Sequence, residues 1–233
     1  MVAQTVALGP EFDALPDDTE EGLAGTSLHQ GAITALYTSL VLCGPRRGLP
    51  WFVGNQIKIV IPRQGNKAPS MPYPDILVHP TVTNASRSSL VLAADGPPAL
   101  VIEVASPATA LEHDINLTSP TGKPRVYEAI GVKEYLVFDP AGEILAAQVW
   151  ARRATPGGFV PWQQEVDGRW VSATLGIAFQ PQGVLLRVYD QDGKLVPITE
   201  ELADLVDERD RRLAQQEQRL STLEEELRKL RER

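Results

Sequence analysis

Hydrophobic and polar positions along the chain change from helical spacing to strand-like alternation and back. Residues 26–42 place apolar side chains at helical spacing, and Gly44-Pro45 predicts the end of this helix. Residues 51–61 alternate apolar and polar side chains and predict one strand. Shorter apolar runs predict a helix at residues 126–130 and strands at residues 76–78, 90–93, 99–102, 135–138, 144–150, 159–160, 170–171 and 184–189. The predicted fold class is α/β, with a mixed central sheet flanked by helices.

The last segment of the chain has a seven-residue repeat in place of these short patterns. One seam position holds Val206, Leu213, Leu220 and Leu227, and the other holds Leu202, Leu223 and Leu230, with Arg209 and Gln216 interrupting it. A heptad pattern of this kind predicts a C-terminal coiled-coil helix that joins two chains into a homo-oligomer, in the simplest case a dimer. A single amphipathic helix that folds back on the domain is the alternative interpretation.

Composition and charge divide the chain into three parts. Its 233 residues, 43% of them apolar, are enough for one sizeable core. We predict an acidic N-terminal arm over residues 1–24, an α/β domain over residues 25–197 and the coiled-coil helix over residues 198–233. The net charge is −8, but residues 23–200 hold 14 acidic and 14 basic residues, so the acidity lies at the two ends. Such a domain can bind nucleic acid through a local patch, whereas strong non-specific binding is not expected.

Compartment signals point to the cytoplasm and away from a membrane. No apolar run reaches the roughly 20 residues of a membrane helix, and the N-terminus lacks the pattern of a signal peptide. Cys43 is the single cysteine, which excludes an internal disulfide and fits a buried thiol in a reducing compartment. No cluster of Cys and His residues has zinc-binding spacing.

Three charged residues stand out because of the elements they join. Asp75 opens one apolar strand, Glu103 ends another, and Lys123 precedes a helix. A carboxylate at the end of a buried strand is costly unless it has a partner, and a divalent metal is a natural partner for two of them. Oxygen ligands suit Mg²⁺, which keeps several waters and bridges to phosphate. A nearby lysine can hold or help deprotonate the attacking water, and it can stabilise the extra negative charge of the transition state.

Four segments carry a resemblance to a known family. They are residues 74–78 (PDILV), 100–107 (LVIEVASP), 123–127 (KPRVY) and 131–140 (GVKEYLVFDP). In their order and spacing they resemble the Uma-type family of putative restriction endonucleases, part of the PD-(D/E)XK nuclease superfamily. The resemblance covers about residues 26–190, and the Glu-Tyr-x-x-x-Asp-Pro strand makes it fairly specific.

The resemblance implies a restriction-endonuclease-like fold, DNA as the substrate and a Mg²⁺-dependent site, with Mn²⁺ able to substitute. Asp75 and Glu103 would ligate the metal, and Val104 would offer its backbone carbonyl. The superfamily's basic pattern has a lysine two positions after the glutamate, where this chain has Ala105. In the Uma-type pattern the lysine precedes the next helix, four residues before a tyrosine, as Lys123 precedes Tyr127. Tyr127 itself is interpreted as a packing residue.

The chain departs from the family pattern around Lys123 and at its N-terminus. Asn116–Gly122 has the pattern of an inserted loop, Pro124 follows the lysine, and Asp114 matches a family acid expected to support or cap the site. The candidates for the family's glutamate near the first helix are Glu20 and Glu21. His29 matches a family histidine, for which packing, capping and DNA contact stay open; His79 and His113 receive no role.

The first functional hypothesis is therefore a metal-dependent endonuclease that acts on DNA. The acidic balance keeps a second hypothesis open, in which the nuclease fold serves as a binding or assembly module and the coiled coil is its working part. A third is a phosphodiesterase that acts on RNA or on a small nucleotide.

Overall fold

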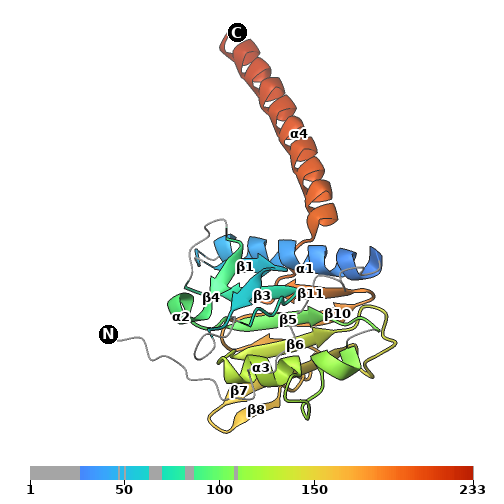
Figure 1. The fold of residues 1–233 in the computed structure, drawn as a ribbon. Helices are drawn as coiled ribbons and strands as arrows, with labels where there is room; N and C mark the ends of the chain where they lie inside the picture. Colours follow the sequence, from blue (N-terminus) through green and yellow to red (C-terminus); the bar gives the residue numbers. More distant parts are fainter. Residues whose placement is uncertain are drawn as a thin grey trace. The chain divides into compact units, whose positions relative to one another are not determined.

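A computed structural model describes residues 27–46, 48–49, 51–62, 70–81, 87–107 and 110–232 of the chain (Figure 1). The predicted N-terminal arm, with Glu20 and Glu21, lies outside these residues. The chain divides into two compact units, the first ending at Val196 and the second beginning at Pro197. Each unit is described by itself.

A six-stranded mixed sheet in the order β1-β3-β5-β6-β7-β8 forms the centre of the first unit. Its strands are β1 (Phe52–Asn55), β3 (Ile76–His79), β5 (Leu100–Val104), β6 (Glu134–Phe138), β7 (Val149–Thr155) and β8 (Gly158–Pro161). Strands β5 and β6 run parallel, and the other neighbouring pairs in this sheet are antiparallel. Every residue of β3, β5 and β6 is buried, as their continuous apolar runs predict.

The two faces of the sheet belong to two separate cores. Helix α1 (Ser27–Arg46) packs with Leu100, Ile102 and Val104 of β5 on one face. Helix α3 (Lys123–Ala129) packs with Val101 on the other. Because successive side chains of a strand alternate between faces, Glu103 belongs with Val101 on the α3 face. The predicted fold class, a mixed central sheet flanked by helices, is confirmed.

Smaller elements complete the first unit. A three-stranded antiparallel sheet has the order β11-β10-β9, a parallel pair joins β2 to β4, and two short helical segments lie outside the sheets. These elements are β2 (Lys58–Val60), β4 (Ser89–Val91), α2 (Leu92–Asp95), the π-helical turn η3 (Ala110–Asp114), β9 (Trp170–Ser172), β10 (Ile177–Gln182) and β11 (Leu185–Tyr189). Strands β9, β10 and β11 pack into the same core as α1, so they extend that layer.

Three predictions from local pattern are wrong. The single strand expected at residues 51–61 is divided between β1 and β2, because Gln56 between them has a positive φ of 49°. The strand expected at residues 144–150 begins only at Val149, since the Asp139 carboxylate accepts hydrogen bonds from the backbone N–H groups of Ile144 and Leu145. Helix α1 continues past Gly44 and ends at Arg46. The local pattern did not predict strand β10.

The second unit is one long helix, α4 (Thr199–Arg231). The backbone N–H of Ile198 donates to Glu201 Oε2 at 3.1 Å, which satisfies one of the free donors at the helix start. None of its residues is buried within this chain. In the part of the chain that the structure describes, no helix combines the length and apolar character of a membrane span.

Candidate active site

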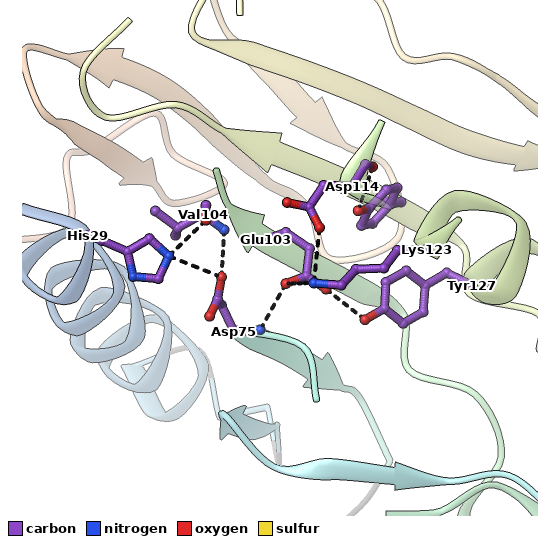
Figure 2. A network of polar contacts seen from close by, with 8 residues as sticks. His29, Asp75, Glu103, Val104, Asp114, Lys123 and Tyr127 are labelled. Atoms are coloured by element: carbon purple, nitrogen blue, oxygen red, sulfur yellow. Dashed lines mark hydrogen bonds and ion pairs between the residues drawn. The ribbon is translucent and has the colours of Figure 1, made fainter. Parts of the chain in front are cut away.

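Asp75 and Glu103 meet at one end of two neighbouring strands. Strands β3 and β5 pair with Ile76 opposite Ile102, so the antiparallel register places Asp75, one residue before β3, beside Glu103. The backbone N–H of Asp75 donates to Glu103 Oε2 at 3.3 Å. The backbone N–H of Val104 in turn donates to Asp75 Oδ2 at 2.8 Å. Backbone N–H groups of Asp75 and Val104 therefore hold the two predicted carboxylates in place (Figure 2).

Lys123 reaches this pair from the start of α3. Its Nζ lies 3.2 Å from Glu103 Oε2 and 3.0 Å from Asp114 Oδ1, and both acids are buried. Figure 2 shows the ammonium group between the two carboxylates. Asp114 lies in η3, so the structure places it beside the lysine, in the supporting position that the sequence predicted. Pro124, in the first turn of α3, does not prevent this reach.

The Asn116–Gly122 loop fixes where α3 begins. The Asn116 side-chain oxygen accepts hydrogen bonds from the backbone N–H groups of Thr118 and Ser119, both at 3.0 Å. A Cβ at Gly122 would lie 2.3 Å from the Asn116 carbonyl oxygen, so only glycine fits this close approach. The inserted loop therefore closes on itself directly before Lys123 and sets the position of that residue.

Tyr127 does more than the packing role predicted for it. Its hydroxyl donates a hydrogen bond to Glu103 Oε1 at 2.7 Å, and its ring centroid lies 5.1 Å from that of Tyr135. Lys123 and Tyr127 lie on one face of α3, four residues apart, so the same helix supplies a donor to each oxygen of Glu103. The packing interpretation is incomplete: Tyr127 also orients the Glu103 carboxylate.

Val104 and His29 lie on the α1 side of Asp75. His29 Nε2 donates a hydrogen bond to the Val104 carbonyl oxygen at 2.9 Å and lies 3.8 Å from Asp75 Oδ2. This polar contact at the site is not among the roles left open for His29, which were packing, capping and DNA contact. The Val104 carbonyl, predicted as a metal ligand, and the Asp75 carboxylate therefore both face His29 Nε2 (Figure 2).

The electrostatics of the site are set by burial. Burial raises the pKa of Glu103 to about 8, although the Lys123 ammonium acts in the opposite direction. Burial also raises the pKa of Asp75, against the lowering effect of the Val104 N–H group. Burial alone would lower the pKa of Lys123, but Glu103 and Asp114 raise it above its ordinary value. Burial thus disfavours the ionised forms of Asp75 and Glu103, and a cation bound beside them would favour those forms.

Gln56 is a residue at the site that the sequence analysis missed. Its backbone N–H donates to the Asp75 carbonyl oxygen at 3.0 Å, and its side-chain amide lowers the pKa of the Asp75 carboxyl group. The amide nitrogen is buried. A non-glycine residue with positive φ is uncommon and strained, which is frequent at functional sites. Alternation alone could not have revealed it, because Gln56 occupies an ordinary polar position in the pattern.

The remaining candidates are two histidines and the two glutamates of the N-terminal arm. His79 is at the opposite end of β3 from Asp75, where its Nδ1 is 3.3 Å from the backbone N–H of Thr81 and burial lowers the pKa of the imidazole. His113 is half-buried in η3. Glu20 and Glu21 lie outside the described residues, so their predicted role at the site stays a prediction.

The oxygen atoms of Asp75, Glu103 and the Val104 carbonyl could hold a hard divalent cation such as Mg²⁺, which takes oxygen ligands and keeps several waters. Among the described residues, no group of three or more His, Cys, Asp or Glu side chains is placed to hold a metal by itself. The backbone carbonyl and water would therefore have to complete the ligand set. A divalent cation would favour the ionised forms of both carboxyl groups, against the effect of burial.

Comparisons with known proteins bear on the same segments. A search of curated proteins gives no match. Among solved structures, the chain is similar to one described as a "putative nuclease belonging to DUF820" from Anabaena variabilis, at 13% identity and a TM-score of 0.40, over 76% of this chain and 74% of that one. A family model described as "putative restriction endonuclease", Uma2, matches residues 22–166. That match spans more than half of the chain and contains Asp75, Glu103 and Lys123, so the chain belongs to the Uma2 family.

Proposed function

We propose that this protein is a Mg²⁺-dependent endonuclease that hydrolyses phosphodiester bonds in DNA, and that Mn²⁺ can substitute. Membership of the Uma2 family supports a nuclease role. The observation that carries the proposal is the meeting of Asp75 and Glu103 beside Lys123 in a buried cluster. We also propose that the protein acts as a homodimer through α4. A cytoplasmic location stays a prediction.

Asp75, Glu103 and the Val104 carbonyl would hold the ion in this proposal. Tyr127 and Lys123 each bind one oxygen of Glu103 and keep the carboxylate in one orientation. Asp114 holds the Lys123 ammonium from its other side. His29 would have to share the Val104 carbonyl with the ion, or release it, because its Nε2 already donates to that oxygen.

The chemistry that Mg²⁺ supplies when bound is a lowered pKa for water and neutralisation of charge on the scissile phosphate. The raised pKa of Lys123 keeps its amine protonated at neutral pH, so this residue donates a hydrogen bond and does not accept a proton. Its ammonium can hold the attacking water and stabilise the extra negative charge that develops on the phosphate. Water attacks phosphorus in line, the bond to the 3′-oxygen breaks, and the products carry a 5′-phosphate and a 3′-hydroxyl.

Cleavage of supercoiled plasmid in Mg²⁺ or Mn²⁺ tests the activity. The wild type should nick or linearise the plasmid, and Asp75→Asn and Glu103→Gln should lose at least about 100-fold in rate because each removes a ligand charge. Asp192→Asn, in an exposed turn, is the matched control and should keep full activity. Equal cleavage by wild type and both site variants would identify a contaminant.

Mn²⁺ binding, measured by electron paramagnetic resonance, gives a second readout that does not need catalysis. The wild type should bind Mn²⁺, and Asp75→Asn should bind it at least about tenfold more weakly. Binding without cleavage of DNA, with cleavage of RNA or a small nucleotide, would move the substrate to that class. If the protein neither binds Mn²⁺ nor cleaves any of these substrates, the nuclease proposal is wrong. The hypothesis of a binding and assembly module, with α4 as its working part, would then remain.

A further inference from the structure

Helix α4 exposes a continuous row of large apolar side chains that nothing in the second unit covers. The row contains Val206, Leu213, Leu220, Leu223, Leu227 and Leu230, and these side chains are 44–65% exposed. An isolated helix derives little stability from its own hydrogen bonds, and most helices gain it by burying an apolar face. Large apolar residues that repeat along one face mark an interaction surface.

The repeat defines which positions lie at the seam and which lie beside it. Spacings of three from Val206 to Arg209 and of four from Arg209 to Leu213 assign Val206, Leu213, Leu220 and Leu227 to heptad position a. Position d then holds Leu202, Arg209, Gln216, Leu223 and Leu230. The positions that flank the seam follow from this register: g holds Leu205, Arg212, Arg219 and Glu226, and e holds Asp210, Glu217, Glu224 and Arg231, so the charged g–e pairs begin at Arg212.

Charges at these flanking positions complement one another in one orientation. In a parallel, in-register pair of helices, each g residue faces the e residue five positions later on the partner. The pairs are Arg212 with Glu217, Arg219 with Glu224, and Glu226 with Arg231, and each occurs twice by symmetry. All three pairs join opposite charges. The basic residue is at g in the first two pairs and at e in the third, so a shift by one heptad would bring Arg219 against Arg231.

An antiparallel pair satisfies these charges less well. In that orientation e residues face e residues and g residues face g residues. When the leucine layers overlap from end to end, Glu217 faces Glu224 of the partner, twice by symmetry, although Arg219 faces Glu226. In the parallel pair, all three g–e pairs are opposite in charge. The charge pattern therefore favours the parallel orientation.

The polar seam residues restrict the pairing further. From Leu213 to Leu230 the a and d layers are leucine except at Gln216, and a single buried polar layer specifies register and chain number at some cost in stability. Arg209 would meet its own copy at a d position, so the pairing should be strongest from Leu213 onward.

We propose that α4 forms a parallel, in-register, two-stranded coiled coil with α4 of a second copy of this chain, through the seam from Leu213 to Leu230 and the three g–e pairs. Its consequence for cleavage rests on the proposed function. Both chains enter a parallel coil from their Thr199 ends, so the dimer tethers two catalytic units to the same end of the coil. Two sites tethered together favour cuts in both strands of one duplex during a single encounter.

Charge reversal in the full-length protein tests the pairing. E217R/E224R and R212E/R219E should each lower dimer affinity by about 100-fold, since each changes four attractive contacts into repulsive ones. A mixture of the two variants should restore a complex of twice the 25.4 kDa chain mass, because every g–e pair is then opposite in charge. Mass in solution is measured by light scattering, and helicity by circular dichroism shows that α4 is retained.

Disulfide trapping tests the orientation. In a Cys43→Ala background, Leu230→Cys should cross-link through oxidised glutathione, because a d residue faces its own copy only in a parallel, in-register pair. Lys229→Cys, on the outer face, is the control and should stay uncross-linked. Three results would each overturn the proposal: a monomeric wild type, tight homodimers of both charge-reversed variants, or failure of Leu230→Cys to cross-link.

Plasmid cleavage tests the consequence of the pairing. If the charge-reversed variants still nick the plasmid but no longer linearise it, the result supports the tethering. If the wild type does not cleave at all, the result concerns the proposed function alone.

Discussion

Two lysine–glutamate pairs of similar length lie in opposite surroundings. Lys123 Nζ is 3.2 Å from Glu103 Oε2 in the site, and Lys229 Nζ is 3.4 Å from Glu225 Oε1 on α4. The Glu103 side chain is 2% exposed, whereas that of Glu225 is 58% exposed. Around the first pair, burial removes water that would solvate the charges, and only the protein can replace it. The second pair is surrounded by water and contributes little. Distance alone therefore does not tell what an ion pair does.

Removal of the lysine should give the largest difference in stability and cleavage between the two ion pairs. Lys123→Met leaves Glu103 without its ammonium partner, so the free energy of unfolding above pH 8 should fall by about 3 kcal/mol and plasmid cleavage by 100-fold or more. Lys229→Met should change stability by less than about 0.5 kcal/mol and leave cleavage intact. Denaturant unfolding and plasmid assays measure both. Equal losses for the two variants would contradict the assigned difference.

The pH dependence of stability should separate the same two glutamates. The folded protein holds a proton on Glu103 more tightly than the unfolded chain does, because the pKa rises from 4.5 to about 8. This stabilisation is complete below about pH 4.5 and is lost as the pH rises through about 8, at up to about 1.4 kcal/mol per pH unit for a whole proton. Glu103→Gln should remove this slope and Glu225→Gln should keep it, as measured by unfolding of metal-free protein at a series of pH values. An unchanged slope in Glu103→Gln would assign the pH dependence to another group.

Gln56 tests whether the buried site also depends on an uncharged neighbour of Asp75. Gln56→Gly removes the amide beside Asp75 while glycine accepts the φ of 49°, so cleavage should fall about tenfold with no loss of thermal stability. Gln148→Gly is the matched control, since Gln148 also has a positive φ, of 54°, but lies outside the site. Equal cleavage rates for both variants would remove Gln56 from the site.

The smallest effect is expected on the outer face of α4. Glu208 forms an exposed ion pair with Arg212 one turn away, and it is not part of any g–e pair. Glu208→Gln should cost less than about 0.5 kcal/mol in thermal unfolding and leave the mass in solution unchanged. A monomeric Glu208→Gln variant would show that outer-face charges, and not the seam and its flanks, determine association.

Much of the site could be predicted from local sequence. Asp75, Glu103 and Lys123 each lie at the boundary of an element, and element boundaries leave a pattern of apolar runs and turn residues. The heptads of α4 are equally local. Local pattern predicts only a packing role for Tyr127, because a sequence does not show that its hydroxyl meets a carboxylate 24 positions away. The strand expected at residues 144–150 was shortened by hydrogen bonds to Asp139, which apolar pattern does not report.

Local sequence was enough to predict the α/β class, the two carboxylates and the lysine of the candidate site, and the apolar seam of α4, because period and residue type are carried within a few neighbouring positions. Three features are visible only in the folded chain: Gln56 turns the chain beside Asp75, Asp114 and Glu103 share Lys123, and His29 reaches the Val104 carbonyl. These contacts depend on the register of β3 against β5 and on the packing of α1 and α3 over opposite faces of the sheet. Register is a property of paired strands, and a single chain segment does not contain it.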